Sequence, residues 1–531
     1  MKIGSTEEVP SSWEFPAIEE IVEVNPKLDK TQFEDDLDVS FVPMPAVEAE
    51  SGVIDVSESK AFSDVKKGYT AFQEKDVLFA KITPCMENGK MAVVPSVNNG
   101  LGFGSTEFHV LRSYGGISPQ YVYYYVSSKL FRIEAEHHMT GAVGQRRVPA
   151  PWLSAVEIPL PPSNEQHRIV AKIEELFSEL DKGIESLKTA REQLKVYRQA
   201  LLKHAFEGKL TEQWRKDNAD KLETADQLLE RIKQEREVRY QQQMEEWKAA
   251  IKQWEADGKE GKKPRKPTKL KDIQLISDGE LGTLPLISEH WVWVRYGDLC
   301  SIVRNGISKK PVGEEGDKIF RISAVRPMLF DMDDYRIIQN QDGEFDGYYL
   351  VTGDLVFTRY NGSRRYVGVC ANYKSDEKRL FPDKLIQTRP DLPSVSASFL
   401  EKALNSGGSR QFVESKIRTT AGQSGVSGGD IKNIPVPICT KAEQQRIIEQ
   451  LESSLSIIEE NEKVIDFGLA KSEALRQSIL KKAFTGQLVS QDPDDEPASA
   501  LLDRIAKEKE EAAAKAKKAK AVKKKITRKA N

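Results

Sequence analysis

The sequence predicts an α+β protein in which two globular domains alternate with two long coiled-coil helices. Three observations support this prediction: an internal repeat, a composition rich in glycine and β-branched residues at the start of each repeat, and a heptad pattern that follows it along the chain. Because 531 residues exceed the roughly 100 to 200 that one domain usually holds, several units are expected. The predicted segments are a first globular domain at 1–157, a helical spacer with a linker at 158–280, a second globular domain at 281–433, and a second helical spacer with a basic tail at 434–531.

The repeat rests on motifs that recur at one fixed distance. The segment EQHRI at 165–169 returns as EQQRI at 443–447, and AFEGKL at 205–210 returns as AFTGQL at 483–488. Both pairs have an offset of 278 in residue number, and the same offset carries Trp13 onto Trp291. A register kept over most of the chain indicates duplication, so we expect an internal pseudo-twofold repeat.

Each repeat begins with short predicted strands. Runs such as DVLF at 76–79 and YVGV at 366–369 are β-branched or aromatic and are bounded by turn residues, which is typical of strands. Each region closes on a proline-rich stretch, IPLP at 158–161 and IPVP at 434–437, where proline prevents a helix and favours an extended connector. We therefore expect two compact α+β domains.

A long helix is expected after each connector. Ser163 and Thr440 are the expected N-caps, and apolar residues recur every seven positions between 173 and 201, as they do in a coiled coil. The pattern also places Tyr197 in the first seam and Leu475 in the second, weaker seam. The two helices are expected to act as spacers.

A further helical stretch follows each long helix, at 226–256 and at 498–514. Trp247 and Trp254 in the first stretch are either partner contacts or packing residues, because tryptophan serves both purposes. The lysine, glycine and proline of 257–268 predict a solvated linker. The tail at 515–531 has nine basic residues and no acidic one, which predicts a disordered segment.

Composition and charge restrict the function classes. No apolar run approaches the roughly 20 residues that span a bilayer, and the start of the chain lacks a secretory signal, so a cytoplasmic protein without a membrane contact is expected. The four cysteines are widely spaced and are expected to be core residues. Since the net charge is -3, any nucleic-acid-binding surface must be segregated: 13–155 holds 13 basic and 20 acidic residues, whereas 291–432 holds 21 and 18.

The sequence shows no recognisable catalytic motif. It has no GxxxxGK[ST] phosphate loop, its six histidines form no HExxH, and it lacks the Asn/Asp-Pro-Pro-aromatic motif expected of an adenine methyltransferase. The nearest nuclease-like group is Asp383 with Glu414 and Lys416, whose carboxylates could hold Mg²⁺. We expect a chain that is not itself an enzyme.

Two Trp-started globular domains, each followed by Ile-Pro-x-Pro, Glu-Gln-x-Arg-Ile, a long helix and Ala-Phe-x-Gly-x-Leu, resemble the specificity subunits of type I restriction-modification enzymes. The resemblance covers essentially the whole chain and is strongest at 159–210 and 435–488. It implies that the globular domains are target-recognition domains, which read two half-sites of one bipartite, asymmetric DNA target. It also implies that the helices are spacer regions that dock two modification subunits.

The resemblance further implies the partners and cofactors. The partners are double-stranded DNA, two modification subunits that methylate adenine N6, and restriction subunits that translocate and cleave DNA. S-adenosylmethionine, ATP and Mg²⁺ are expected on those subunits, and no cofactor is expected on this chain. Two alternatives remain: a stand-alone Mg-dependent nuclease that uses Asp383 and Glu414, and a coiled-coil structural adaptor.

Residues for DNA contact are expected in one loop region of each globular domain, because Arg suits guanine, Asn suits adenine, and Tyr can stack or bind phosphate. In the second domain the loop residues are Arg359, Tyr360, Asn361, Arg364, Arg365 and Tyr366, and the additional candidates outside the loop are Lys384, Arg418, Thr420, Gln423 and Ser424. The offset of 278 gives Lys81, Thr83, Asn88 and Lys90 in the first domain, with Gln145, Arg146 and Arg147 near its end.

Overall fold

The structure is a computed structural model that describes residues 9–142, 144–261, 263–268, 271–312, 314–420, 422–511 and 514. Contacts divide the chain into two compact units: unit 1 comprises Met1–Lys188 and Ile465–Asn531, and unit 2 comprises Thr189–Val464. Unit 1 therefore joins the two ends of the chain, whereas the segments read from the sequence are consecutive. The basic tail expected at 515–531 lies outside the described residues.

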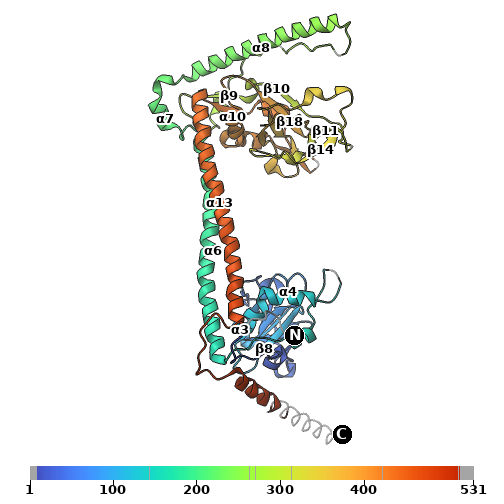
Figure 1. Ribbon diagram of the computed structural model, residues 1–531, viewed down its shortest axis with the longest axis vertical. Helices are drawn as coiled ribbons and strands as arrows, with labels where there is room; N and C mark the ends of the chain where they lie inside the picture. Colours follow the sequence, from blue (N-terminus) through green and yellow to red (C-terminus); the bar gives the residue numbers. More distant parts are fainter. Residues whose placement is uncertain are drawn as a thin grey trace. The chain divides into compact units, whose positions relative to one another are not determined.

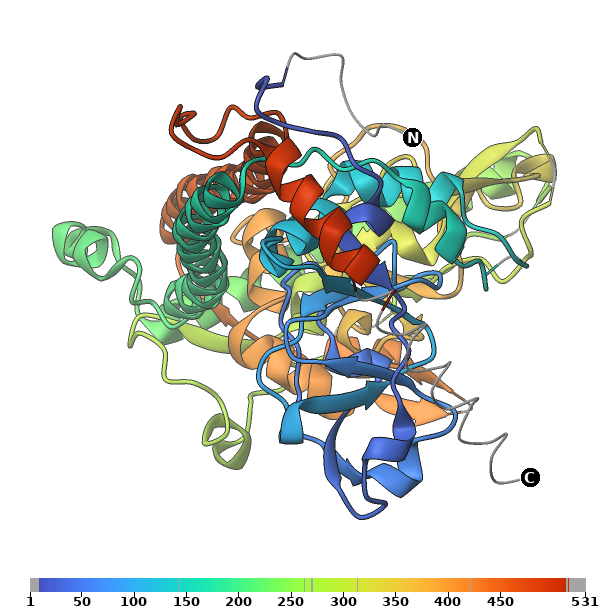
Figure 2. The same ribbon diagram turned by 90° about the horizontal axis from the view of Figure 1, so that it is seen from below.

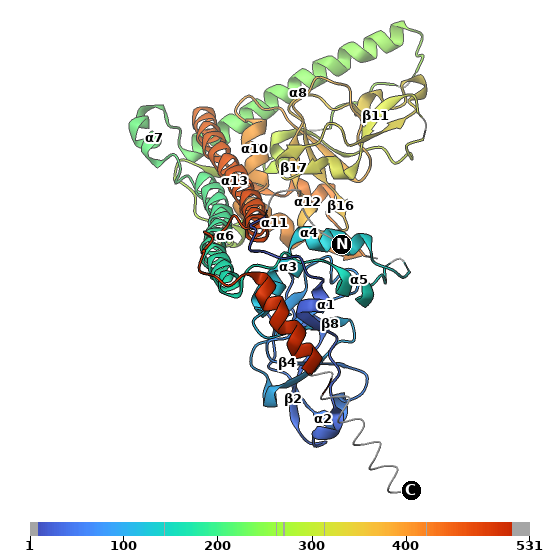
Figure 3. The same ribbon diagram turned by 60° about the horizontal axis from the view of Figure 1, so that its bottom comes forward.

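Unit 1 contains two four-stranded sheets that carry short helices (Figure 3). The first sheet has the order β1-β8-β5-β6 with antiparallel neighbours, and the second has the order β3-β2-β7-β4 with β2 and β7 parallel. The strands are β1 (Val22–Val24), β2 (Asp38–Val42), β3 (Ser59–Ala61), β4 (Thr70–Gln73), β5 (Val77–Ala80), β6 (Met91–Val93), β7 (Leu101–Gly104) and β8 (Phe108–Ser113). The helices are α1 (Ile18–Ile21), α2 (Phe62–Val65), α3 (Pro119–Ser127), α4 (Lys129–His137) and α5 (Ala150–Ala155).

Unit 2 repeats the first sheet with the order β10-β18-β15-β17. Figure 1 labels β10 and β18 of this sheet. Further antiparallel pairs in unit 2 are β9 with β21, β11 with β14, and β12 with β13. The strands are β9 (Val292–Arg295), β10 (Cys300–Asn305), β11 (Asp317–Phe320), β12 (Val325–Arg326), β13 (Leu329–Phe330), β14 (Tyr335–Ile338), β15 (Leu355–Thr358), β17 (Cys370–Asn372), β18 (Leu385–Pro390) and β21 (Pro435–Ile438). The short helices are α7 (Glu212–Asp217), α9 (Asp278–Leu281), α10 (Ala397–Leu404), α11 (Gly407–Lys416) and α12 (Gly428–Lys432).

The two units match element by element at the offset read from the sequence. The long helices α6 (Ser163–Phe206) and α13 (Lys441–Phe484) begin and end at equivalent residues. Strands β5 and β15 do the same, and so do the starts of α3 and α10 and of α4 and α11. The internal repeat is therefore a repeat of structure, and the predicted α+β class with two long helices is confirmed.

Each long helix begins at a buried polar cluster. Glu165 accepts a hydrogen bond from the Trp13 indole at 3.0 Å, and Glu443 accepts one from the Trp291 indole at 3.0 Å. The glutamine that follows each glutamate accepts a hydrogen bond at 2.9 Å from the N-capping serine of α3 or α10. The repeated tryptophan and Glu-Gln motifs thus join each globular region to the helix that follows it.

Within each unit, part of α6 lies beside part of α13 (Figure 2). In unit 1 the Asp181 carboxylate pairs with Arg476, and in unit 2 Arg198 pairs with Glu462 at 2.9 Å. The prediction that places Tyr197 and Leu475 in the seam is wrong, because their exposed fractions are 54% and 48%. A straight helix has 3.6 residues per turn, so a strict seven-residue spacing drifts by about 20° per heptad away from the contact.

The first half of helix α8 (Ala225–Ala256) packs against the rest of unit 2. Leu228 and Ile232 are buried, and the Arg236 guanidinium pairs with Asp298 at 2.9 Å. Its second half is lined by the lysine-rich linker: the Trp247 indole donates to the carbonyl of Pro264 at 3.2 Å, and the Trp254 indole donates to that of Gly261 at 3.4 Å. Both tryptophans therefore pack against the linker. None of the described helices has the length and apolarity needed to cross a membrane.

Candidate nucleic-acid interface

A small three-stranded sheet in unit 2 brings together residues that lie far apart in the sequence. Strand β16 (Tyr360–Asn361) pairs with β20 (Gln423–Gly425), and β20 pairs with β19 (Arg418–Thr420), all antiparallel. The loop after β15 and the polar run at 418–424, two of the regions predicted from the sequence to contact DNA, thus form one surface.

A polar cavity of 240 Å³ opens at this sheet. It is lined by Ile322, Ser323, Arg326, Tyr360, Asn361, Gly362, Lys384 and Gln423. Four of these residues were predicted from the sequence. Ser323 and Arg326 were not, since they come from η6 (Ile322–Ala324) and β12, well before the loop along the chain, and no local pattern marks them.

Cations at the site stack on aromatic rings. The Arg359 guanidinium lies 4.7 Å and the Lys384 ammonium 5.2 Å from the centre of the Tyr360 ring. The Arg326 and Arg365 guanidinium groups lie 4.7 Å and 4.4 Å from the centre of the Tyr366 ring. Such contacts orient the cations, since the ring face is negative.

Hydrogen bonds hold the loop that carries these groups. Asn361 accepts from the backbone amide of Ser363 at 2.9 Å, which closes a local turn. Arg410 of α11 donates to the carbonyl of Val367 at 2.7 Å and to that of Arg365 at 3.2 Å. The loop is therefore shaped by the protein before any ligand arrives, which lowers the entropic cost of binding.

The remaining residues predicted in this domain take different positions. Arg364 is exposed and donates to the carbonyl of Glu414 at 3.1 Å, and Arg418 is exposed on β19. Ser424 is buried, and its hydroxyl lies 2.9 Å from that of Thr419, so it supports the sheet from within. Thr420 ends β19.

Unit 1 contains the same backbone pairing at the equivalent place. Ile82 pairs with Arg147, which corresponds to Tyr360 with Gly425, and Thr140 also pairs with Arg147, which corresponds to Arg418 with Gly425. The amide of Thr83 further donates to the carbonyl of Arg146 at 3.0 Å. The predicted residues at 81–83 and 145–147 therefore lie together in the folded chain.

The cations of this first copy are paired with carboxylates. Arg147 donates to both carboxylate oxygens of Glu107, at 2.7 and 2.9 Å, and this contact lowers the pKa of Glu107. Arg146 lies 3.4 Å from Glu87 and 3.2 Å from Glu136. Burial lowers the pKa of Lys81, whose neighbour Glu107 opposes that effect. The first copy thus presents less free positive charge than the second.

The three other predicted residues of the first domain, Lys90, Asn88 and Gln145, differ in their surroundings. The Lys90 ammonium donates to the carbonyl of Val47 at 2.6 Å, so it is engaged inside the domain. Asn88 is exposed on the turn after residue 83. Gln145 is also exposed, and its carbonyl accepts from Arg147 at 2.9 Å.

The nuclease-like residues do not form a metal site. Asp383 offers its carbonyl to Arg359 at 3.2 Å, and the Glu414 carboxylate accepts from Arg410 at 3.0 Å. Among the residues that the structure describes, no group of three or more His, Cys, Asp or Glu side chains is arranged to hold a metal ion.

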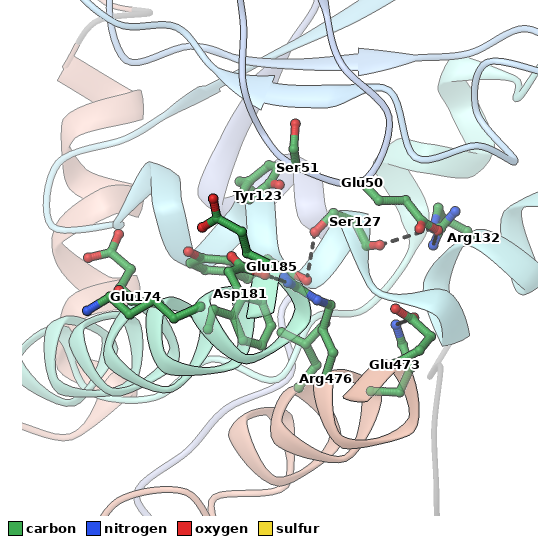
Figure 4. A pocket seen from close by; sticks show the side chains of 16 residues that line it. Glu50, Ser51, Tyr123, Ser127, Arg132, Glu174, Asp181, Glu185, Glu473 and Arg476 are labelled. Carbon is green, nitrogen blue, oxygen red and sulfur yellow. Dashed lines mark hydrogen bonds and ion pairs between the residues drawn. The ribbon is translucent and has the colours of Figure 1, made fainter. Parts of the chain in front are cut away.

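A larger cavity of 460 Å³ lies in unit 1, between α3 and the two long helices (Figure 4). Two ion pairs form among its charged groups: Arg132 pairs with Glu50 at 2.6 Å, and Arg476 pairs with Asp181. Arg476 also lies 4.3 Å from the centre of the Phe177 ring. The Tyr124 ring of α3 meets the Phe177 ring of α6 edge to face, with 5.8 Å between the ring centres, so the globular region contacts a long helix at this cavity.

Comparison with known proteins identifies relatives over most of the chain. The family model of the type I restriction modification DNA specificity domain matches residues 10–190. The chain is 28% identical to the EcoEI type I specificity subunit of Escherichia coli, covering 85% of this chain and 79% of that protein. It is 29% identical to the EcoAI subunit of Escherichia coli, with coverages of 84% and 78%. The resemblance seen in the sequence motifs is confirmed.

Solved structures share the fold. An HsdS subunit from Thermoanaerobacter tengcongensis superposes with a TM-score of 0.52 at 18% identity, covering 91% of this chain and 99% of that one. A chain from a structure of type I R-M complex assembly and conformational transition superposes with a TM-score of 0.62 at 18% identity, with coverages of 91% and 100%.

Proposed function

We infer that this chain is the DNA specificity subunit of a type I restriction-modification enzyme. The observation that carries this function is the duplicated strand pairing, Tyr360 with Gly425 in unit 2 and Ile82 with Arg147 in unit 1. Each copy gathers polar residues on one surface, but the residues differ. Two similar frames with different side chains suit a bipartite target whose two half-sites have different sequences.

The roles of individual side chains follow from their chemistry. Asn361 lines the 240 Å³ cavity, and Arg359 stacks on the Tyr360 ring, which also lines it. Arginine can make a bidentate contact with guanine, and asparagine with adenine. In unit 1, Thr83 is the equivalent of Asn361 at the offset of 278, and Arg147 pairs with the neighbouring Ile82. Methylation, ATP-driven translocation and cleavage belong to partner subunits, which bind S-adenosylmethionine, ATP and Mg²⁺.

The test is methylome sequencing of cells that express this chain with a matching modification subunit. A two-part N6-methyladenine motif that depends on this chain is expected. Arg359→Ala with Asn361→Ala should relax one half of the motif, and Thr83→Ala with Arg147→Ala should relax the other. Arg446→Ala, an exposed change on α13, is the control and should leave both halves intact. A soluble complex with an active modification subunit and no chain-dependent motif would point to the adaptor alternative.

We also propose that the modification subunits dock on the long helices. Tyr197 and Leu475 are equivalent residues of the repeat, and both leave about half of an apolar side chain exposed. Equivalent apolar positions on two equivalent helices suit two copies of one partner. Tyr197→Asp and Leu475→Asp should each remove one modification subunit in native mass spectrometry. The exposed Val312→Asp in unit 2 should remove none.

A further inference from the structure

Four cations gather at one edge of unit 2. Arg326 and Arg365 share the Tyr366 ring, while Arg359 and Lys384 share the Tyr360 ring. Within the part of the chain that the structure describes, none of the four forms an ion pair, although many arginines of unit 2 do. Like charges held this closely repel one another, which favours the binding of an anion between them.

The donors at this cluster are only partly used. Arg326 donates to the carbonyl of its neighbour Val325 at 3.1 Å, and Arg365 donates to the Tyr366 hydroxyl. Arg365 is exposed, and Arg326 is half-buried. A guanidinium has five N–H donors, so each side chain keeps donors that can point to a tetrahedral oxyanion.

The backbone around the cluster is fixed from two sides. Arg326 ends β12, which pairs with β13, and Tyr366 ends η9 (Arg364–Tyr366). Arg410 clamps the carbonyl of Arg365. The two guanidinium groups are therefore brought to one ring by segments that are distant along the chain, and neither depends on the ligand for its place.

The equivalent cluster is missing from unit 1. At the offset of 278, Arg326 corresponds to Glu48 and Arg365 to Glu87, and η6 matches η2 (Met44–Ala46), which confirms the register at this point. Glu87 faces Arg146, so the first copy balances its charge internally. Two acids in one unit thus stand where the other has two arginines.

We propose that Arg326, Arg365 and Tyr366 bind a phosphate of the DNA backbone, and that unit 2 thereby supplies most of the salt-sensitive affinity of this chain for its target. This inference rests on the proposed function. The two units then contribute differently to binding. Unit 2 holds the duplex by charge, whereas unit 1, whose cations are paired with carboxylates, contributes recognition. Phosphate contacts position a protein without reading sequence.

The experiment uses the full chain in complex with its modification subunits. Binding to a target duplex and to a scrambled duplex is measured from about 0.05 to 0.5 M salt, for the natural chain and for Arg326→Gln with Arg365→Gln. Loss of one phosphate contact should lower the slope of log affinity against log salt by about 1 and weaken binding roughly eightfold near 0.1 M salt, equally for both duplexes. Arg446→Gln, on the exposed start of α13, is the matched control and should change neither.

Other results overturn the inference. An unchanged slope in the doubly substituted chain would show that no phosphate is bound there. A loss confined to the target duplex, or an altered methylation motif, would show that these arginines read bases. Failure of the proposed function looks different, because the natural complex would then prefer no sequence at all. Equal melting temperatures of the natural and substituted complexes ensure that binding and not folding is compared.

Discussion

Gly425 decides where Tyr360 lies. A Cβ at position 425 would fall well inside van der Waals contact of the Tyr360 ring, and the paired strands leave the ring little room to move. In unit 1 the equivalent pair is Ile82 and Arg147, where no ring crosses the partner strand. One glycine thus allows the second copy of the site to stack cations on a tyrosine.

Gly425→Ala is expected to push the Tyr360 ring out of the cavity. Overpacking of this kind costs about 1 to 3 kcal/mol, and methylation of the half-site read by unit 2 should weaken while the other half persists. Gly347→Ala is the control, because a Cβ there meets open space. Methylome sequencing and thermal melting of the two variants provide the comparison. Equal effects at both half-sites would contradict a local role for this glycine.

His109 is hydrogen-bonded to the segment that carries Arg147 in the first copy of the site. Its Nε2 atom lies 2.8 Å from the carbonyl of Val148, the residue after Arg147, and Nδ1 lies 3.0 Å from the Asn25 amide nitrogen. The neutral ring, which donates to Val148 and accepts from Asn25, satisfies both contacts. Burial lowers the pKa of this imidazole.

The stability of unit 1 is therefore expected to depend on pH. Because the folded pKa lies below the unfolded value of about 6.5, the unfolded chain binds more protons in acid, so the stabilisation is complete above that pH and declines below it. If folding lowers the pKa of His109 by one, the free energy of unfolding above that pH gains about 1.4 kcal/mol. Melting at pH 7.5 and 5.5 should show a smaller acid loss for His109→Gln than for the natural chain. The same loss in both would exclude His109 as the cause, and His290→Gln, at a more exposed histidine, is the control.

At the scale of elements, the two long helices start on the same motif with different neighbours. Glu443 accepts from Trp291, from the Thr211 hydroxyl at 2.7 Å and from Arg215 at 2.6 Å. Glu165 accepts from Trp13 and Gln491, and none of the arginines that the structure describes forms an ion pair with it. Burial accordingly raises the pKa of Glu165.

These neighbours predict opposite outcomes for one substitution. Glu443→Gln leaves Arg215, whose side chain is only 12% exposed, without its counter-charge and should cost about 3 kcal/mol. Glu165→Gln should change stability by less than about 1 kcal/mol at pH 7, because a raised folded pKa means that ionised Glu165 contributes no stability above its ordinary range. Calorimetric melting of both variants measures the difference. Equal losses would show that the counter-charge does not matter.

At the scale of the whole molecule, the hydrophobic core of each unit contains residues from both repeats. The core that contains Trp13 also contains Ala483 and Leu501, and the core that contains Trp291 also contains Phe206 and Ile232. The segment after each long helix therefore packs on the globular region of the opposite repeat. The consecutive division into 1–157, 158–280, 281–433 and 434–531 describes the order along the chain, whereas the cores are shared between repeats.

A chain that ends at Asp278 lacks the part of the unit 1 core that the second repeat supplies, which includes Ile479, Ala483 and Leu501. Two such chains can satisfy each other, because Leu201, Ala205 and Phe206 match Ile479, Ala483 and Phe484 at the offset of 278. The truncated chain is expected to be a dimer by light scattering and, with modification subunits, to direct methylation of a symmetric target. A well-folded monomer would contradict the shared core.

Most of the architecture was predictable from the sequence. The repeat at an offset of 278, the strand-like composition and the heptads are local or periodic signals. They therefore indicated the two α+β domains, the two long helices and the family resemblance. The loops at 81–83 and 359–366 could be chosen in the same way, since they follow recognisable strands. Tyr197 and Leu475 were placed wrongly because a heptad count ignores the drift of a 3.6-residue turn.

Only the tertiary structure decided which charges remain free. Arg326 reaches Tyr366 although a long stretch of chain separates them, while Arg146 and Arg147 are neutralised by Glu87, Glu136 and Glu107 from separate segments. Neither fact is visible in the sequence, because pairing depends on distances of a few ångströms between side chains far apart along the chain. The sequence by itself determined the repeated frame and the family that the chain resembles, and the fold decided how the two copies of the site differ in charge.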